Sequence, residues 1–398
     1  MVKSEKITIL MSFLVAAFLD IKTINAYMAK GAEEGGYMAK LYLLVIGGIL
    51  LLLLYKKNVK KLPRTSFFIS AFLCISYLLT MVVYGSPRVS PIFFIVFTIS
   101  SFIIPFLVEI NARFMLKMMM VLSAPAILYI NQIFTFQSLY METISMGICY
   151  AFLTPIIASI VYMSCYFSNE SFVQKIISLV LFAINIVFLL YLFLYGSRGP
   201  LVAVFSLIII LLLAKVSENG KGIVFNKRRI RFCILVSIIL IGLGFAVFHS
   251  LNDFFTSRGI NVRFIEKMLI TEDAGDVSNG RNKLYEMAFS DFCQSPIWGR
   301  GVDRFSANHQ VESYPHNFIL QILSDGGLLL FLILFVPIIK RVRYLMKSCN
   351  IDRFAILLML FFASVPGAMF SGDLWECSNL WFLFGALLSN RLIQSRNA

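Results

Sequence analysis

The sequence predicts an all-α, polytopic integral membrane protein with about 12 transmembrane helices and one long polar loop late in the chain. Of its 398 residues, 59% are hydrophobic and 14% are charged, and the mean hydropathy is +0.84. The apolar residues fall into runs of about 20, the length of a helix that crosses a bilayer. A soluble globule of this size cannot bury so much apolar surface, and seven scattered cysteines exclude a disulfide scaffold.

Each predicted span is an apolar run that charged residues or Gly and Pro turns interrupt. Asp20 and Lys22 shorten the first run. We expect about nine spans in residues 1–249 and about three in 317–398, on either side of a large outer loop at 250–316. The approximate limits of the runs are 7–25, 38–55, 65–84, 90–108, 114–131, 145–167, 176–195, 200–215, 232–249, 317–338, 354–371 and 379–393.

The distribution of Lys and Arg predicts that both chain ends face the cytoplasm. With the N-terminus inside, 23 of the 35 basic residues lie in inner segments, as the positive-inside rule requires. This topology explains the net charge of +14 without a nucleic-acid partner. Residues 1–6 lead into a span without a small-residue cleavage site, so we expect that span to direct insertion into the inner (cell) membrane of a bacterium.

The predicted outer loop at 250–316 carries seven basic and nine acidic residues. Loops of this length are usually functional or disordered. Leu284, Met287, Ala288 and Phe292 have helical spacing, which predicts a helix along or near the membrane surface. We therefore expect an active site on this face of the membrane.

A first motif, Tyr-Gly-Ser-Arg-Gly-Pro at 195–200, places Arg198 in a tight turn at the outer boundary. An arginine there is costly unless it meets an anion, and its guanidinium fork suits phosphate or diphosphate. The alternative is an ordinary turn whose arginine extends to lipid headgroups.

A second motif begins at Gly280, where Ser278 and Asn279 can start a helix. Arg281 and Lys283 would then oppose the dipole of its first turn, which indicates a negative group nearby. The turn at 296–301, which contains Arg300, would end the helix. The alternative is a solvated charged face.

A third motif is Tyr314-Pro315-His316-Asn317, where the loop re-enters the membrane. His316 can transfer a proton, or bind phosphate when it is charged, and the alternative is a structural histidine. Asp325 follows at membrane depth, so it should face a polar cavity or a basic partner such as Arg198, Arg281 or Lys283.

Other polar residues show no catalytic pattern. His249, His309 and Cys293 lack the spacing of metal ligands, so we expect no metal and no cofactor. Short outer loops hold three charged residues that could line a site but are expected mainly to contact headgroups: Arg88, Asp373 and Glu376. Trp375 and Trp381 are expected to anchor the protein at the membrane interface.

The ordered set of motifs resembles the O-antigen polymerase and O-antigen ligase superfamily. The set consists of the Ser-Arg-Gly turn, Arg281 with the later Pro-x-x-Gly-x-Gly turn, and His316-Asn317 followed after nine residues by Gly327. The motifs lie within 195–200 and 280–330. Leu330 stands where the ligase pattern has a second Gly, and Tyr-Pro-His-Asn looks more like the polymerases. The resemblance therefore favours a polymerase and keeps a ligase as the alternative.

The resemblance implies a metal-independent glycosyltransferase with a GT-C-like helical fold, acting on undecaprenyl-diphosphate-linked oligosaccharides at the periplasmic face. By the same resemblance, Arg198 and Arg281, with Lys283 or Arg300, would bind the donor diphosphate. His316 would orient or deprotonate the acceptor hydroxyl, or bind phosphate. The substrate site would also include Tyr314, Asn317 and Asp325. Whether a chain-length regulator binds stays open.

A transporter, such as a polysaccharide flippase, is the alternative from another class. Such carriers also have about 12 spans with both ends inside, but they usually carry their longest loop centrally and on the cytoplasmic side. Here the longest loop is late and outside, and the sequence shows no symmetry between two halves.

Overall fold

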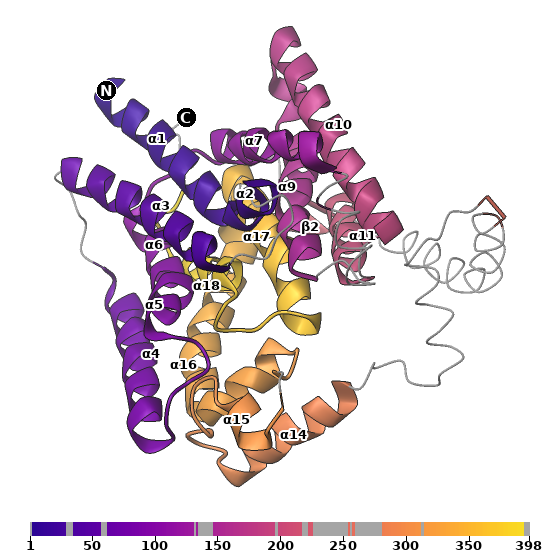
Figure 1. The fold of residues 1–398 in the computed structure, drawn as a ribbon. Helices are drawn as coiled ribbons and strands as arrows, with labels where there is room; N and C mark the ends of the chain where they lie inside the picture. The colour runs from indigo at the N-terminus through magenta and orange to yellow at the C-terminus, as the bar shows by residue number, and fades with distance from the viewer. Residues whose placement is uncertain are drawn as a thin grey trace.

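The computed structural model describes residues 2–28, 35–56, 62–130, 133, 146–195, 198–216, 222–225, 254, 257–258, 281–311 and 314–393. Helices dominate these residues (Figure 1), and a short antiparallel hairpin joins β1 (Ala214–Val216) to β2 (Ile223–Phe225). The fold is that of an all-α, multi-pass membrane protein.

Helical segments make up most of the described chain before residue 130. They are α1 (Val2–Leu19), α2 (Ile21–Met28), α3 (Gly35–Tyr55), α4 (Arg64–Val83), α5 (Pro91–Phe93), the π-helix η1 (Phe94–Ser100), α6 (Ser101–Leu107), α7 (Ala112–Ser123) and the 3-10 helix η2 (Ala124–Tyr129). The later helices are α9 (Met146–Cys165), the 3-10 helix η3 (Phe167–Asn169), α10 (Phe172–Tyr195), α11 (Arg198–Leu213), α14 (Arg281–Gln294), α15 (Phe305–His309), α16 (Phe318–Ser348), α17 (Ile351–Phe370) and α18 (Ser378–Leu388).

Every predicted apolar run within the described residues is helical. Seven described helices are long and apolar enough to cross a membrane, and the bent pair α1 and α2 would make an eighth. Three predicted runs form shorter apolar helices, at Pro91–Leu107, Gly199–Leu213 and Ser378–Leu388. The run predicted at 232–249 lies outside the described residues, so the total of 12 remains a prediction.

The bend between α1 and α2 falls at Asp20, where the sequence shortens the first apolar run. The two helices meet at 64°. Asp20 is buried, and the Thr23 hydroxyl lies 2.8 Å from its Oδ1 atom and 2.8 Å from the Ala151 carbonyl oxygen. The polar residue within the apolar run thus marks the bend between the two helices. A carbonyl group of α9 accepts a hydrogen bond from Thr23, next to this bend.

Ion pairs join loops that the sequence places on one side of the membrane. Lys56 Nζ lies 3.1 Å from Glu109 Oε2, and Lys117 Nζ lies 2.9 Å from Glu170 Oε1. All four residues belong to predicted inner segments or their borders. In Figure 1 the start of α1 and α7 lie toward one end of the molecule, whereas α14 and α15 lie at the other. Which end faces the cytoplasm remains a prediction.

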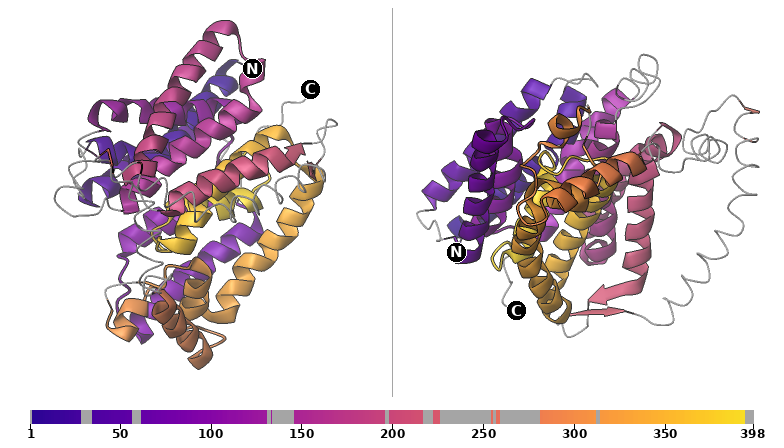
Figure 2. Two further views of the ribbon diagram at one scale, coloured as in Figure 1. Left: turned by 90° about the vertical axis from the view of Figure 1, so that its right-hand side faces the viewer. Right: turned by 90° about the horizontal axis from the view of Figure 1, so that it is seen from below.

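Helices α17 and α18 occupy the centre of the molecule. Figures 1 and 2 show them between α3–α6 on one side and α9–α11 on the other. Trp375 and Trp381 are fully buried there, with stacked rings whose centroids are 5.7 Å apart. The prediction that they anchor the protein at the membrane interface was wrong, because both indole N–H groups find acceptors inside the protein: Asp325 Oδ2 and the Leu374 carbonyl.

Candidate functional site

The turn at 296–301 is held against a break in α16. Gly327 interrupts the helix with φ 62° and ψ −164°, which frees backbone groups that would otherwise pair within the helix. The turn supplies their partners through four backbone hydrogen bonds: Arg300 N to Ser324 O (2.8 Å), Gly301 N to Asp325 O (3.0 Å), Leu328 N to Pro296 O (2.8 Å) and Leu329 N to Ile297 O (3.1 Å). The second and third sequence motifs therefore meet here.

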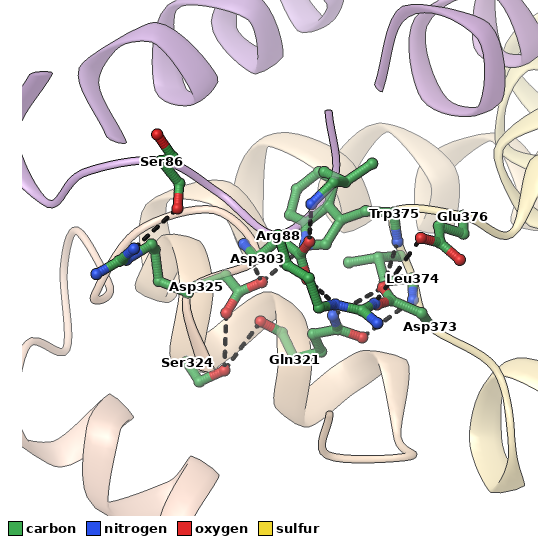
Figure 3. A network of polar contacts seen from close by, with 12 residues as sticks. Ser86, Arg88, Asp303, Gln321, Ser324, Asp325, Asp373, Leu374, Trp375 and Glu376 are labelled. Carbon is green, nitrogen blue, oxygen red and sulfur yellow. Dashed lines mark hydrogen bonds and ion pairs between the residues drawn. The ribbon is translucent and has the colours of Figure 1, made fainter. Parts of the chain in front are cut away.

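A network of buried carboxylates extends from this contact (Figure 3). Asp325 Oδ2 accepts hydrogen bonds from the Trp375 indole N–H (2.7 Å) and from the backbone N–H of Asp303 (3.0 Å). Asp303 Oδ2 in turn accepts the backbone N–H of Val89 (2.6 Å). Burial raises the pKa of Asp303 to about 6, against the lowering effect of the nearby Arg88 charge.

Arg88 is the cation of this network. Its guanidinium donates to Asp373 and lies 3.7 Å from Asp303 Oδ1 and 4.0 Å from Glu376 Oε1. It also lies 5.4 Å from the ring centroid of Tyr314. The expectation that Arg88, Asp373 and Glu376 mainly contact headgroups is corrected: Arg88 joins three loops, at 84–90, 299–304 and 371–377, into one polar surface.

A polar cavity of about 260 Å³ lies beside this network. Asp373 belongs to both, because its Oδ1 accepts hydrogen bonds from Gln321 Nε2 (3.0 Å) and the Trp375 backbone N–H (2.9 Å) while the residue also lines the cavity. The cavity lies among α2, α9, α17 and the loop before α18. The residues that line it include Lys22, Tyr150, Tyr314, Gly367, Ser371, Asp373 and Glu376.

Tyr150 brings the first motif to this cavity. Its hydroxyl lies 3.5 Å from Ser371 Oγ, and a Cβ atom added at Gly199 would lie 2.0 Å from the same hydroxyl oxygen. Only a glycine therefore fits at the start of α11. Arg198, next to it, begins that helix, and its side chain lies outside the described part of the structure.

Arg281 brings the second motif to the same place. It is the first residue of α14, and its positive charge acts on Tyr150, Tyr314 and His316. Burial raises the pKa of Tyr314, and the charges of Arg88 and Arg281 oppose that rise. The guanidinium of Arg281 is thus within electrostatic reach of the cavity wall.

His316 completes the group. Its backbone has φ 54°, its ring centroid lies 4.4 Å from that of Tyr314, and the Tyr314 hydroxyl donates to the Ser371 carbonyl (2.7 Å). Burial and the Arg281 charge lower the pKa of His316 to about 4, against a hydrogen bond with the Ser371 backbone. The imidazole is therefore neutral near pH 7 and can accept a proton.

The remaining predicted residues lie apart from the cavity or stabilise its walls. Lys283 is exposed on α14. Arg300 donates to Asp291 Oδ1 (2.8 Å) and Gln294 Oε1 (2.9 Å), near the C-terminal end of the same helix.

Two further predicted residues have structural partners. Asn317 Oδ1 caps α16 by accepting the N–H groups of Ile319 (3.0 Å) and Leu320 (3.2 Å). Asp325 has an indole and a backbone amide as partners, and not the basic side chain that its place in the sequence suggested.

Sequence reasoning missed Tyr150, Asp303 and Gln321. Asp303 carried a signal, since this carboxylate falls on the same predicted side of the membrane as Arg88, Asp373 and Glu376. Tyr150 and Gln321 carried none, because one tyrosine or glutamine inside an apolar helix looks like ordinary packing. Their roles follow from helix pairing, which the sequence does not display.

Replacing Gly199 by Ala should displace Tyr150 and impair the cavity. We expect Gly199→Ala to lose most activity, because the added Cβ would lie 2.0 Å from the Tyr150 hydroxyl oxygen. The double variant Gly199→Ala/Tyr150→Phe should recover part of that loss, because it removes the clashing atom and leaves the nearest contact at 3.1 Å, to Tyr150 Cζ. Activity at matched protein level is the measurement, and absence of any rescue would contradict the contact.

Among the residues that the structure describes, no group of three or more His, Cys, Asp and Glu side chains is placed to hold a metal ion. Among the described residues, the cations that face the cavity or act on it include Lys22, Arg88 and Arg281. The expectation that the protein uses no cofactor remains a prediction.

The fold and site together define a multi-pass membrane protein with a polar cavity near the start of α9, the end of α17 and the start of α18. Residues 183–335 match the sequence family described as O-antigen ligase. This match covers less than half of the chain, and it supports the resemblance of its motifs to the O-antigen polymerase and ligase superfamily. The matched region includes Gly199, Arg281, Tyr314 and His316.

The members of this family are glycosyltransferase-like enzymes that act on lipid-linked sugars, and both polymerases and ligases belong to it. A search of the curated proteins found no match to the chain.

Proposed function

We propose that this protein is an O-antigen, or surface-polysaccharide, polymerase. It would join undecaprenyl-diphosphate-linked oligosaccharide repeat units at the periplasmic face of a bacterial inner membrane, without a metal. The observation that supports this most is the meeting of three motifs, far apart in sequence, around one polar cavity: Gly199 against Tyr150, the Arg281 charge, and His316 beside Tyr314.

The proposed reaction is one glycosyl transfer. The acceptor hydroxyl oxygen bonds to the anomeric carbon of the donor sugar, and the bond from that carbon to the diphosphate oxygen breaks. The diphosphate leaves with the bonding electrons, and the hydroxyl proton passes to a base. Arg281 and Arg198 would hold the diphosphate and stabilise the charge that develops on it.

His316 is the proposed base, and its environment depends on the donor. In the free protein the Arg281 charge helps to lower its pKa to about 4. A bound diphosphate would neutralise Arg281, so the pKa of His316 would rise and the imidazole would become a stronger base. Donor binding would thereby make His316 better able to accept the proton of the acceptor hydroxyl.

The place of the site suits a lipid-linked substrate. A polyprenyl chain enters sideways through the bilayer, its diphosphate lies at the interface, and its sugars extend into water. Helix α11, which begins at Arg198 next to the Gly199–Tyr150 contact, has exposed apolar side chains that suit contact with lipid, such as Val202 and Phe205.

A ligase, which would transfer polymer to lipid A core, is the second candidate, because the matching family carries the description of an O-antigen ligase. Leu330 favours the polymerase. It is buried against Gly326, where a Cβ atom would lie 2.4 Å from Leu330 Cδ2, so this chain fills with leucine a position that the ligase pattern gives to glycine.

Deleting the gene and examining the lipopolysaccharide on a gel tests the function. For a polymerase we expect core that carries a single repeat unit, with the ladder restored by the wild-type gene. Core without any repeat, together with polymer on the lipid carrier, would identify the ligase. An unchanged ladder would contradict both assignments and favour a transporter.

The acid limb of the pH–activity profile should report His316. Because the pKa of His316 in the folded protein is about 4, below its usual 6.5, the proton-accepting form should persist well below pH 6.5. We expect kcat/KM of the purified enzyme to fall only as the pH approaches about 4.

The depressed pKa of His316 in the folded protein also affects stability. Its contribution to the free energy of unfolding is fully present above pH 6.5 and is lost as the pH falls toward about 4.

Arg281→Gln should move the acid limb of the activity profile to higher pH, because the Arg281 charge contributes to the lowered pKa of His316. A limb at pH 6.5 in both proteins would exclude His316 as the base.

A further inference from the structure

We propose that a second cavity, remote from the catalytic site, binds the phosphate headgroup of an anionic phospholipid. This cavity has a volume of about 510 Å³ and lies beside the C-terminal half of α16. Arg341 on its wall follows Gly327 by 14 residues in the same helix, or about 21 Å along the helix axis. The inference goes beyond the proposed glycosyl transfer and does not depend on it.

The charged residues that line the cavity are all basic. They are Lys340, Arg341 and Arg391, and its lining contains no Asp or Glu. Within the described part of the chain, no carboxylate forms an ion pair with Lys340 or Arg341. Arg353 lies close enough to interact electrostatically with Arg341, which adds a further positive charge near that residue. Such a concentration of positive charge attracts an anion.

The guanidinium of Arg341 is already fixed in place. Its Nε donates to the Leu387 carbonyl (3.3 Å) and its Nη2 donates to Asn390 Oδ1, near the C-terminal end of α18. The side chain also lies 4.8 Å from the ring centroid of Tyr344. A guanidinium has five N–H groups, so donors remain for a phosphate oxygen after these bonds. Phosphate would therefore meet an arginine that needs little reordering.

The surroundings of the cavity favour a lipid as the source of the phosphate. Phe106, Pro337 and Leu388 give it an apolar wall. Next to it, α4 and α16 present apolar side chains with large exposed fractions: Phe67 66%, Phe68 58%, Val336 41% and Ile339 47%. Acyl chains can pack along such surfaces while the headgroup occupies the basic cavity.

The helix ends around the cavity indicate its depth. α4 begins at Arg64, α6 ends at Leu107 and α18 ends at Leu388, all beside the cavity. Helix ends of spanning segments lie near the boundary between hydrocarbon and water. The positive-inside distribution predicts that this boundary is the cytoplasmic one, where basic pockets between helices bind anionic headgroups.

The test uses the purified full-length protein in neutral phosphatidylcholine nanodiscs, with and without phosphatidylglycerol. Ligand binding to the folded state raises Tm, so Tm is the readout, and native mass spectrometry counts the lipids that stay bound. The variant Lys340→Gln/Arg391→Gln removes two charges and leaves the bonds of Arg341 intact. Its matched control is Arg343→Gln/Lys347→Gln, which removes two exposed charges of α16 that do not line the cavity.

We expect phosphatidylglycerol to raise Tm of the wild type and of the control equally. The cavity variant should lose most of this rise and bind phosphatidylglycerol about tenfold more weakly. An undiminished rise in the cavity variant, or an equal loss in the control, would overturn the proposal. Inorganic phosphate is added in a separate arm. If phosphate alone reproduces the full rise, the cavity binds a soluble anion and the lipid assignment is wrong.

Discussion

Arg281→Ala is expected to lower the rate of glycosyl transfer by about 10²- to 10³-fold, the usual cost of losing one stabiliser of developing negative charge. Arg281 begins α14, and its charge acts on His316 and Tyr314 at the cavity wall. In the proposed reaction that charge faces the departing diphosphate. The measurement is polymer formed from lipid-linked repeat units by purified protein, with the lipopolysaccharide ladder in complemented cells as a second readout.

Two variants separate the role of Arg281 from a general effect of charge. Arg281→Lys keeps the charge and loses the planar fork, so we expect an intermediate rate. Lys283→Ala removes a positive charge from the same turn of α14, but its side chain is exposed, so its effect should be much smaller. Equal losses for Arg281→Ala and Lys283→Ala would indicate a diffuse electrostatic effect. A normal rate in Arg281→Ala, at equal protein level and Tm, would remove Arg281 from the site.

The helical architecture could be predicted because an apolar run of membrane length rarely forms anything but a transmembrane helix. Even the interruption at Asp20 was visible, and the structure places a 64° bend there. The tryptophans show where this reasoning fails. A Trp near the end of an apolar run usually lies at the interface, but Trp375 has a buried carboxylate as its acceptor, 50 positions away in the chain. Such partners follow from tertiary packing and not from local pattern.

Part of the candidate site could also be predicted from local sequence patterns. Arg281 and His316 stood out because a charge in a first helical turn and a histidine at a membrane boundary are locally unfavourable. The partners that position them did not stand out. Arg88 and Asp373 belong to separate short loops, and only the packing of α4, α16 and α17 brings their side chains together (Figure 3). Each of these loops alone resembles an ordinary charged connection.

Gly299→Ala is expected to destabilise the protein by about 3 kcal/mol or more, the scale of severe backbone conflicts. Gly299 has φ 70°, and an added Cβ would lie 2.4 Å from the carbonyl carbon and oxygen of Asp325 and from Gly326 N. These are backbone atoms of the break in α16, which cannot rotate away as a side chain can. Relief of the clash would separate the turn from α16 and break the hydrogen bonds that join them.

Thermal unfolding in detergent measures this effect, with Gly47→Ala as the matched control. Gly47 lies in α3 with no atom within 4 Å of its added Cβ, so the same substitution should leave Tm unchanged or raise it slightly, because alanine favours helix. Gly299→Ala should lower Tm strongly and should also remove activity, since the turn holds Asp303 against Asp325 beside the cavity. If both variants unfold at the wild-type Tm, the close contact between the turn and α16 does not exist, and the motifs at 296–301 and 325–327 must act separately.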